Sequence, residues 1–251
     1  MLNPFFSVII PTLNEEKFLP VILRALTFQT FRDFELLVVD AKSEDKTRDI
    51  FIKFRNSFPR TTLIVSSKKN LAYQRNLGAK SARGKYLIFF DADVNIDPNF
   101  LGMIYNRLVK NNDLLVTTKI TPDSHRVIDK VIIFLSNFFI KLASFTKRPF
   151  IGGYNTIVKK GIFRKLKGFD EKILLGEDYA FSLKAMKNKI RPIILKEPSI
   201  IVSLRRFRSE GRLSVFLKHM ISQIYIFFNG PMTHPLFDYP MGGHVHSEGK
   251  D

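Results

Sequence analysis

The chain has 251 residues, of which 45% are hydrophobic, and this allows one large α/β domain with a substantial core. The absence of cysteine excludes a disulfide framework and thiolate metal sites, which leaves histidine and carboxylates as the ionic ligands for a cation. Lysine and arginine number 40 against 23 aspartates and glutamates, so the formal net charge of +17 favours polyanionic partners such as nucleic acid, anionic lipid or phosphorylated substrates.

Short apolar runs alternate with helical patterns along the first 90 residues. Buried-strand patterns cover residues 5–10, 34–39, 61–65 and 86–90. Helical patterns lie between them, with apolar positions at Leu19, Ile22, Leu23 and Leu26, at Ile50, Ile52 and Phe54, and over about 72–82. Past residue 100 the pattern is less regular and predicts strands at 114–118 and 155–158 and a helix over 179–187. The alternation predicts a mainly parallel sheet with helices on both faces.

Two apolar segments bear on membrane contact. The run over 127–145 is interrupted by polar residues and is too short for the roughly 20 apolar residues of a spanning helix. The segment 213–228 has apolar residues at helical spacing and predicts an amphipathic helix. Each segment either lies in a lipid interface or packs on the core. We expect a domain over 1–212 and a C-terminal helix with an irregular tail over 213–251.

Acidic residues follow three of the predicted strands. The segment Pro11, Thr12, Leu13, Asn14, Glu15 and Glu16 follows the first, Asp40 ends the second, and Asp91, Ala92 and Asp93 follow the fourth. Because sites in such sheets form at the carboxyl ends of the strands, we expect these residues to meet at one edge. Two carboxylates one residue apart suit a hard divalent cation, although such a pair is also common in an acidic turn. For Ser43, Asp45 and Thr47 we favour capping of the next helix.

Several motifs extend this pattern in a fixed order: VIIPTLNEE (8–16), VVD (38–40) with Ser43, Asp45 and Thr47, RNLG (75–78), GKY (84–86), DAD (91–93), GFDE (168–171) and GED (176–178). In these motifs the chain resembles an inverting family 2 glycosyltransferase with the GT-A fold, which has a Rossmann-like sheet flanked by helices. The resemblance covers most of residues 5–190.

The resemblance implies a role for each matching residue. Pro11, Thr12 and Glu15 would line the nucleoside pocket, Asp40 would recognise the base, and Asp91 with Ala92 would lie near the ribose. Asp93 would hold the Mn²⁺ or Mg²⁺ that bridges the diphosphate of a UDP- or GDP-sugar. Arg75 would lie beside the donor or only order its own helix.

The same resemblance assigns the acceptor side. Asp178 matches the catalytic base, and the helix N-terminus that it opens would favour its ionised form, with Glu177 as its neighbour. Gly153 and Asn155 resemble the acceptor segment, where a missing side chain admits a sugar or backbone, or else they form a turn. Arg205 and Arg206 either bind phosphate or belong to a solvated basic face.

These observations predict a metal-dependent enzyme that passes a sugar from a nucleotide-diphosphate donor to an acceptor hydroxyl, on a glycan or a lipid-linked acceptor. The alternatives are a sugar-phosphate nucleotidyltransferase and a basic protein without catalytic function. The start of the chain lacks the pattern of a signal peptide, so we expect a cytoplasmic location, at the cytoplasmic face of the membrane if the apolar helices bind lipid. The lysines are scattered and no nucleic-acid motif is present, so we expect no nucleic-acid partner.

Overall fold

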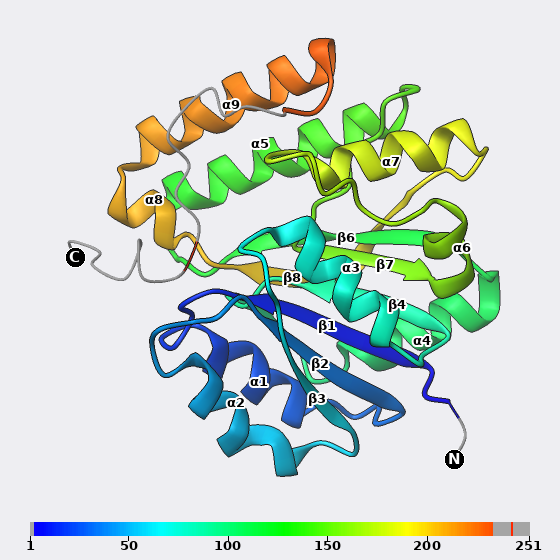
Figure 1. Ribbon diagram of the computed structural model, residues 1–251. Helices are drawn as coiled ribbons and strands as arrows, with labels where there is room; N and C mark the ends of the chain where they lie inside the picture. The colour runs from blue at the N-terminus through cyan, green and yellow to red at the C-terminus, as the bar shows by residue number, and fades with distance from the viewer. Residues whose placement is uncertain (1–2, 233–241, 243–251) are drawn as a thin grey trace.

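The computed structural model describes residues 3–232 and residue 242 (Figure 1). The strands are β1 (Phe6–Thr12), β2 (Phe34–Asp40), β3 (Thr61–Val65), β4 (Tyr86–Phe90), β5 (Val94–Ile96), β6 (Leu115–Pro122), β7 (Asn155–Lys159) and β8 (Ile193–Val202). The helices are α1 (Leu19–Thr27), α2 (Thr47–Phe54), η1 (Arg55–Ser57), α3 (Leu71–Ser81), α4 (Phe100–Asn111), α5 (Val127–Ser144), α6 (Lys160–Lys165), α7 (Glu177–Lys187), α8 (Arg205–Ser209) and α9 (Arg212–Asn229). The expected tail and its three histidines, His234, His244 and His246, lie outside the described residues.

The strands form one sheet in the order β3-β2-β1-β4-β7-β6-β8-β5. The first half, β3 to β4, is parallel, as is the pair β6 and β8, whereas β7 and β5 run antiparallel to their neighbours. Because the chain moves outward from β1 to β2 and β3 and then returns to β4 on the other side, the connections diverge between β1 and β4. That divergence places an opening beyond the carboxyl ends of these two strands.

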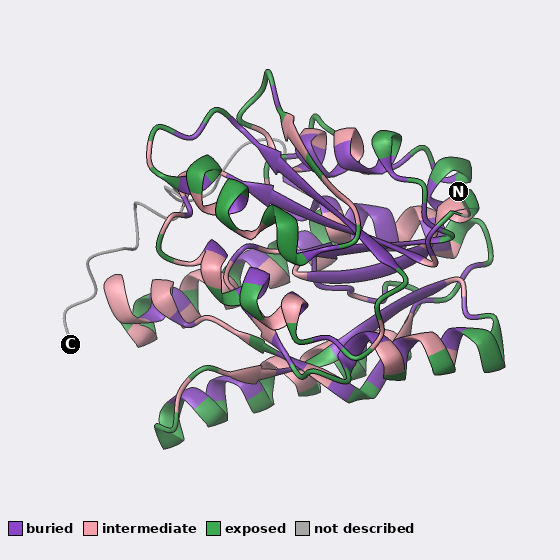
Figure 2. Cartoon of the chain, turned by 90° about the horizontal axis from the view of Figure 1, so that it is seen from below, coloured by how far each residue is buried: buried purple, intermediate pink, exposed green. Residues whose placement is uncertain are grey.

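Helices cover both faces of the sheet, as the sequence predicts. Along β1, Val8 and Ile10 pack with residues of α1, α2 and α4 on one face. Ile9 points to the other face and packs with residues of α3, α6 and α7. The central strands are therefore buried on both sides (Figure 2), which explains why their sequences read as continuous apolar runs.

The two apolar segments of the sequence form α5 and α9, which lie together above the sheet (Figure 1). Each helix buries one side: Ile132 and Ile133 of α5 and Val215 and Ile226 of α9 are almost inaccessible. Within residues 3–232, no helix combines the length and the apolar character that crossing a bilayer requires. The opposite sides of both helices remain exposed.

Candidate functional site

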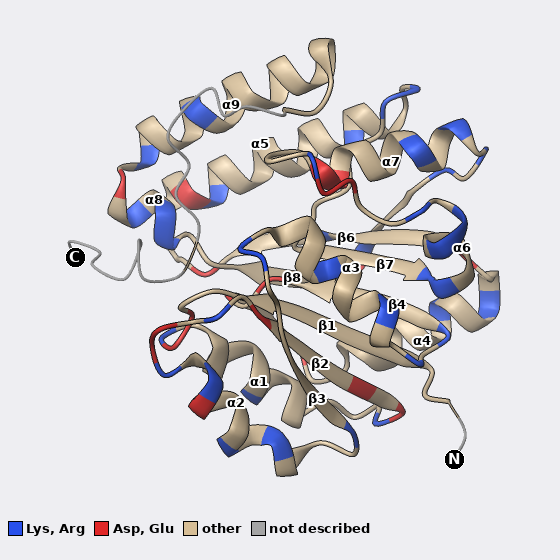
Figure 3. Cartoon of the chain, viewed as in Figure 1, with Lys and Arg blue, Asp and Glu red and all other residues tan. Residues whose placement is uncertain are grey.

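A cleft of about 470 Å³ opens at the carboxyl edge of the sheet and extends between α5 and α9. Most of the residues that the sequence predicts for the site line it: Pro11, Thr12, Glu15, Arg75, Asp91, Ala92, Asp93, Gly153, Glu177, Asp178, Arg205 and Arg206. Two do not, namely Asp40 and Asn155. Acidic residues gather near this edge and at the start of α7, while lysines and arginines spread over the outer helices (Figure 3).

Arg75 of α3 joins three separate segments at the polar end of the cleft, and its side chain is only 1% exposed. Its Nη1 lies 2.6 Å from Oε1 of Glu177, and its Nη2 lies 2.7 Å from Oδ1 of Asp91. Nη2 also donates to the carbonyl oxygen of Gly153 at 2.9 Å. A Cβ at position 153 would come within 2.7 Å of Nη1, so glycine is needed for this approach. The guanidinium of Arg75 occupies the space beside Gly153 that one of the two sequence interpretations left for a sugar or backbone.

Asp178 lies in the first turn of α7 and is held by two backbone amides. Its Oδ2 accepts from the N–H of Gly153 at 2.6 Å, and its Oδ1 accepts from the N–H of Tyr179 at 2.7 Å. Burial and then the neighbouring charge of Glu177 raise the pKa of Asp178, against the opposing effects of Arg75 and the two amides. The backbone N–H of Tyr179 at the start of α7 lowers the pKa, as the sequence argument expects of a helix N-terminus, but desolvation has the larger effect.

Arg205, the first residue of α8, lies between two acidic residues of the cleft. Its Nη1 and Nη2 donate to the two carboxylate oxygens of Glu15 at 2.6 and 3.0 Å, which is a bidentate pair. Its Nε lies 3.0 Å from Oδ2 of Asp93, and its guanidinium carbon lies 4.2 Å from the centre of the Phe18 ring. Arg205 is therefore part of the cleft wall and not of a solvated basic face.

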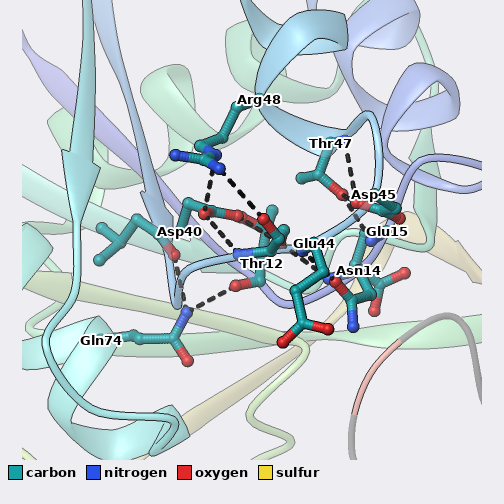
Figure 4. Close-up of polar contacts among 11 residues, drawn as sticks. Thr12, Asn14, Glu15, Asp40, Glu44, Asp45, Thr47, Arg48 and Gln74 are labelled. Carbon is teal, nitrogen blue, oxygen red and sulfur yellow. Dashed lines mark hydrogen bonds and ion pairs between the residues drawn. The ribbon is translucent and has the colours of Figure 1, made fainter.

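The loops after β1 and β2 are joined by side chains that the sequence predicts as helix caps (Figure 4). Three consecutive backbone N–H groups donate to them: Asn14 to Ser43 Oγ at 2.8 Å, Glu15 to Thr47 Oγ1 at 2.7 Å and Glu16 to Asp45 Oδ2 at 3.0 Å. Capping holds for Asp45, whose Oδ1 accepts from the N–H of Thr47, the first residue of α2, at 2.9 Å, whereas the N-cap residue Lys46 makes no side-chain cap bond. The interpretation that all three side chains serve only as caps is corrected, because they also fix the loop that carries Glu15.

Asp40 is fully buried at the end of β2 and holds the same loops together (Figure 4). Its oxygens accept from Thr12 Oγ1 at 3.0 Å, from the Ser43 N–H at 2.9 Å and from Ser43 Oγ at 2.5 Å. Arg48 Nε lies 3.7 Å from Oδ1. Recognition of a base by Asp40 stays a prediction, since the side chain does not line the cleft.

Removing the Ser43 hydroxyl tests this loop junction. Ser43→Ala deprives Asp40 of one donor and the Asn14 N–H of its acceptor in a buried place, so we expect a loss of about 1–3 kcal/mol in the free energy of unfolding. Urea denaturation measures it. Ser57→Ala, at an exposed serine, is the matched control, and equal stability of the two variants would contradict the structural role.

Among the cleft residues that sequence reasoning missed are Gln74 and Tyr154. Gln74 Nε2 donates to the carbonyl oxygens of Thr12 at 2.9 Å and of Val39 at 2.7 Å, which ties the ends of β1 and β2 together. Burial and the charge of Asp178 raise the pKa of Tyr154, so its hydroxyl keeps its proton. In the sequence, the one indication that these two residues belong to the site is their position: Gln74 precedes Arg75, and Tyr154 follows Gly153. Asn155, by contrast, is buried in β7, where its Nδ2 donates to Thr118 Oγ1 at 2.5 Å.

The residues around Asp93 suit a hard divalent cation. Burial raises the pKa of Asp93 to about 7, with contributions from Asp91 and Glu15 and an opposing one from Arg205. Such a carboxylate gains from added positive charge, and its oxygen atoms are the ligands that Mg²⁺ and Mn²⁺ prefer. Among the described residues, no three histidine, aspartate or glutamate side chains gather closely enough to form a metal cage. A cation held at Asp93 would take further ligands from substrate phosphates and water, as is usual for Mg²⁺.

Solved structures share this architecture. TarS of Staphylococcus aureus, residues 1–349 in complex with UDP, superposes with a TM-score of 0.66 at 21% identity, over 89% of this chain and 72% of that one. The mannosyltransferase PcManGT of Pyrobaculum calidifontis, in complex with GDP-Man and Mn²⁺, gives a TM-score of 0.71 at 20% identity, over 90% of this chain and 64% of that one. The fold is therefore that of the GT-A glycosyltransferases.

Sequence comparison adds the family. Residues 7–167 match the family described as Glycosyl transferase family 2, so the chain belongs to this family and is a glycosyltransferase. A curated relative from Methanococcus voltae is 28% identical over 236 residues, which are 87% of this chain and 71% of the relative. It is named dolichyl N-acetyl-alpha-D-glucosaminyl phosphate 3-beta-D-2,3-diacetamido-2,3-dideoxy-beta-D-glucuronosyltransferase. Family membership does not favour the nucleotidyltransferase or a non-enzymatic role.

Proposed function

We propose that this glycosyltransferase moves a sugar from a nucleoside-diphosphate sugar to an acceptor hydroxyl with inversion at the anomeric carbon. The observation that carries the proposal is the cleft itself, where carboxylates from the ends of β1 and β4 and from the start of α7 line one cavity. Glu15, Asp91 and Asp93 form its donor side, and Asp178 is the base. The donors in the complexes of TarS and PcManGT support a UDP- or GDP-sugar for this chain.

The reaction is a single displacement. Asp178 takes the proton of the acceptor hydroxyl, whose oxygen forms a bond to the anomeric carbon while the bond from that carbon to the diphosphate oxygen breaks. The electron pair of the broken bond leaves with the nucleoside diphosphate. The amides of Gly153 and Tyr179 fix the orientation of the Asp178 carboxylate, and each of its oxygens keeps a further lone pair for the incoming proton.

Asp93 would hold the divalent cation, with Asp91 beside it. When bound, the cation acts as a Lewis acid that stabilises the charge on the departing diphosphate. Arg205 adds a second positive group at this end of the cleft, where its guanidinium fork suits phosphate oxygens as well as the Glu15 carboxylate. Arg205 thus offsets part of the carboxylate charge at the wall next to the leaving group.

A panel of UDP- and GDP-sugars, each with and without Mn²⁺ or Mg²⁺, tests the proposal. We expect nucleoside diphosphate to be released from one of them in a cation-dependent reaction, and Asp93→Asn to lower that rate by roughly a hundredfold. Asp49→Asn, at an exposed position of α2, is the control. Release of pyrophosphate, or an Asp93→Asn enzyme as active as the control, would contradict the proposal.

For the acceptor, the name of the Methanococcus voltae relative contains a dolichyl phosphate, and this supports a lipid-linked acceptor for this chain over a free glycan. An acceptor of that kind would bring the enzyme to the cytoplasmic face of a membrane. The exposed apolar sides of α5 and α9 are surfaces that could contact such a membrane.

A further inference from the structure

An exposed apolar face runs along α5 and α9. On α5 the exposed residues recur every three or four positions, at Val127, Ile128, Val131, Phe134, Leu135, Phe138 and Leu142, with Phe145 just beyond its end. On α9 they do so at Leu213, Leu217, Ile221, Ile224, Tyr225 and Phe228. This spacing puts each set on one side of its helix, opposite the side that packs on the core. Exposed apolar surface of this extent marks an interaction site.

The two helices are held side by side in the same direction (Figure 1). Near their first turns, Arg212 Nε lies 2.7 Å from Oδ1 of the buried Asp129. Near their last turns, the Arg148 guanidinium donates to the carbonyl oxygen of Phe227. Because contacts link the two helices near both ends, the apolar residues of α5 and α9 belong to one helical layer.

The charges on this layer favour an anionic partner. Asp129 is the only acidic residue in the sequences of α5 and α9, and it is buried and paired with Arg212. Exposed basic residues border the α5 side at Arg126, Lys130, Lys141 and Lys147. An apolar face bordered by cations complements a bilayer that contains anionic lipid, where apolar burial and electrostatic attraction act together.

The cleft continues from the catalytic carboxylates into the space between the same two helices. Phe139 and Ile140 of α5 line it from one side, and Phe216 and Met220 of α9 line it from the other. Asp178 lines the same cavity. An elongated molecule with an apolar part and a polar head would fit this division of the walls.

We propose that the α5–α9 face lies on an anionic lipid surface, and that the acceptor is an amphiphile whose apolar tail occupies the cleft between these helices while its hydroxyl reaches Asp178. The acceptor half rests on the proposed function. The lipid half depends only on the exposed face and its charges.

Sedimentation with vesicles tests the lipid half. We expect the protein to bind vesicles of phosphatidylcholine with phosphatidylglycerol, and to bind pure phosphatidylcholine much more weakly. Phe134→Ser and Phe138→Ser should each weaken binding by about tenfold or more. Phe28→Ser is the matched control, since Phe28 is 66% exposed like Phe134 but lies at the end of α1.

Equal binding by the α5 variants and the control overturns the lipid half, and so does a wild-type protein that binds no vesicle. A stable dimer in solution that the same variants break into monomers, without vesicle binding, also overturns it, because a second copy would then cover the face.

Acceptors with and without a tail test the other half. Each acceptor sugar is offered on a long alkyl phosphate and on methyl phosphate. Met220→Trp fills the space between the helices. This variant should raise KM severalfold for the acceptor on the long alkyl phosphate and leave KM unchanged for the acceptor on methyl phosphate. Equal effects on both overturn this half. If no nucleotide sugar is turned over, even to water, the proposed function and the acceptor half both fail, while vesicle binding still decides the lipid half.

Discussion

Asp178→Asn is expected to lower kcat by a factor on the order of 10² to 10⁴ while nucleotide-sugar binding is kept, because the amide cannot take the acceptor proton. Both oxygens of Asp178 accept backbone N–H groups, so an amide nitrogen would face either Gly153 or Tyr179 and cost some stability. Initial rates and donor calorimetry separate the two effects, with thermal melting as a check on folding. Normal turnover in this variant would refute the assignment of the base.

The pH profile gives a second measurement of the same group. The base works only when deprotonated, and its pKa is raised, so kcat should fall with decreasing pH at values well above those of an exposed aspartate. Glu177→Gln removes the negative neighbour, and this acid limb should then move to lower pH. An acid limb that stays in place in Glu177→Gln would contradict the coupling between the two carboxylates.

Arg75→Met is expected to give the largest loss of stability, roughly 3–5 kcal/mol, because it leaves the carboxylates of Glu177 and Asp91 without the buried charge that pairs them. Urea denaturation at low temperature measures the loss. Arg83→Met, at an exposed arginine, should change stability by less than about 0.5 kcal/mol.

A double variant isolates the buried pair. Arg75→Met with Glu177→Met removes both charges, so it should recover part of the stability lost in Arg75→Met alone. If the losses in the free energy of unfolding of the two single variants simply add in the double variant, the Arg75–Glu177 ion pair at 2.6 Å does not stabilise the fold. The role given to Arg75 is then wrong.

The fold was predictable where burial fixes the pattern. The strands predicted at 61–65 and 86–90 coincide with β3 and β4, and the helix predicted over 72–82 is α3 (Leu71–Ser81). The expectations failed at β8, which lies between β6 and β5, because Lys196, Glu197 and Pro198 interrupt the apolar pattern of this strand. The three residues of β5 are too few to carry a pattern, and they form a strand only because β8 pairs with them.

The sequence predicts which residues form the site, but not which of them pair with each other. Parallel topology brings the ends of β1 and β4 to one edge, so the acidic residues could be gathered from sequence alone. No local pattern reveals that Arg205 pairs with Glu15, 190 positions away, or that Arg75 pairs with Glu177. The capping interpretation of Ser43 failed for the same reason, since a local propensity gave way to a tertiary contact with Asn14.

Arg205 ties the start of α8 to the cleft. This residue opens α8, which leads within a few residues into α9, and its guanidinium separates the carboxylates of Glu15 and Asp93. A truncation before α8 would remove α9 and would also leave the carboxylates of Glu15 and Asp93 without the guanidinium that pairs with both. Engineering of more soluble versions should therefore keep α8 and α9 and alter only the exposed residues of α9.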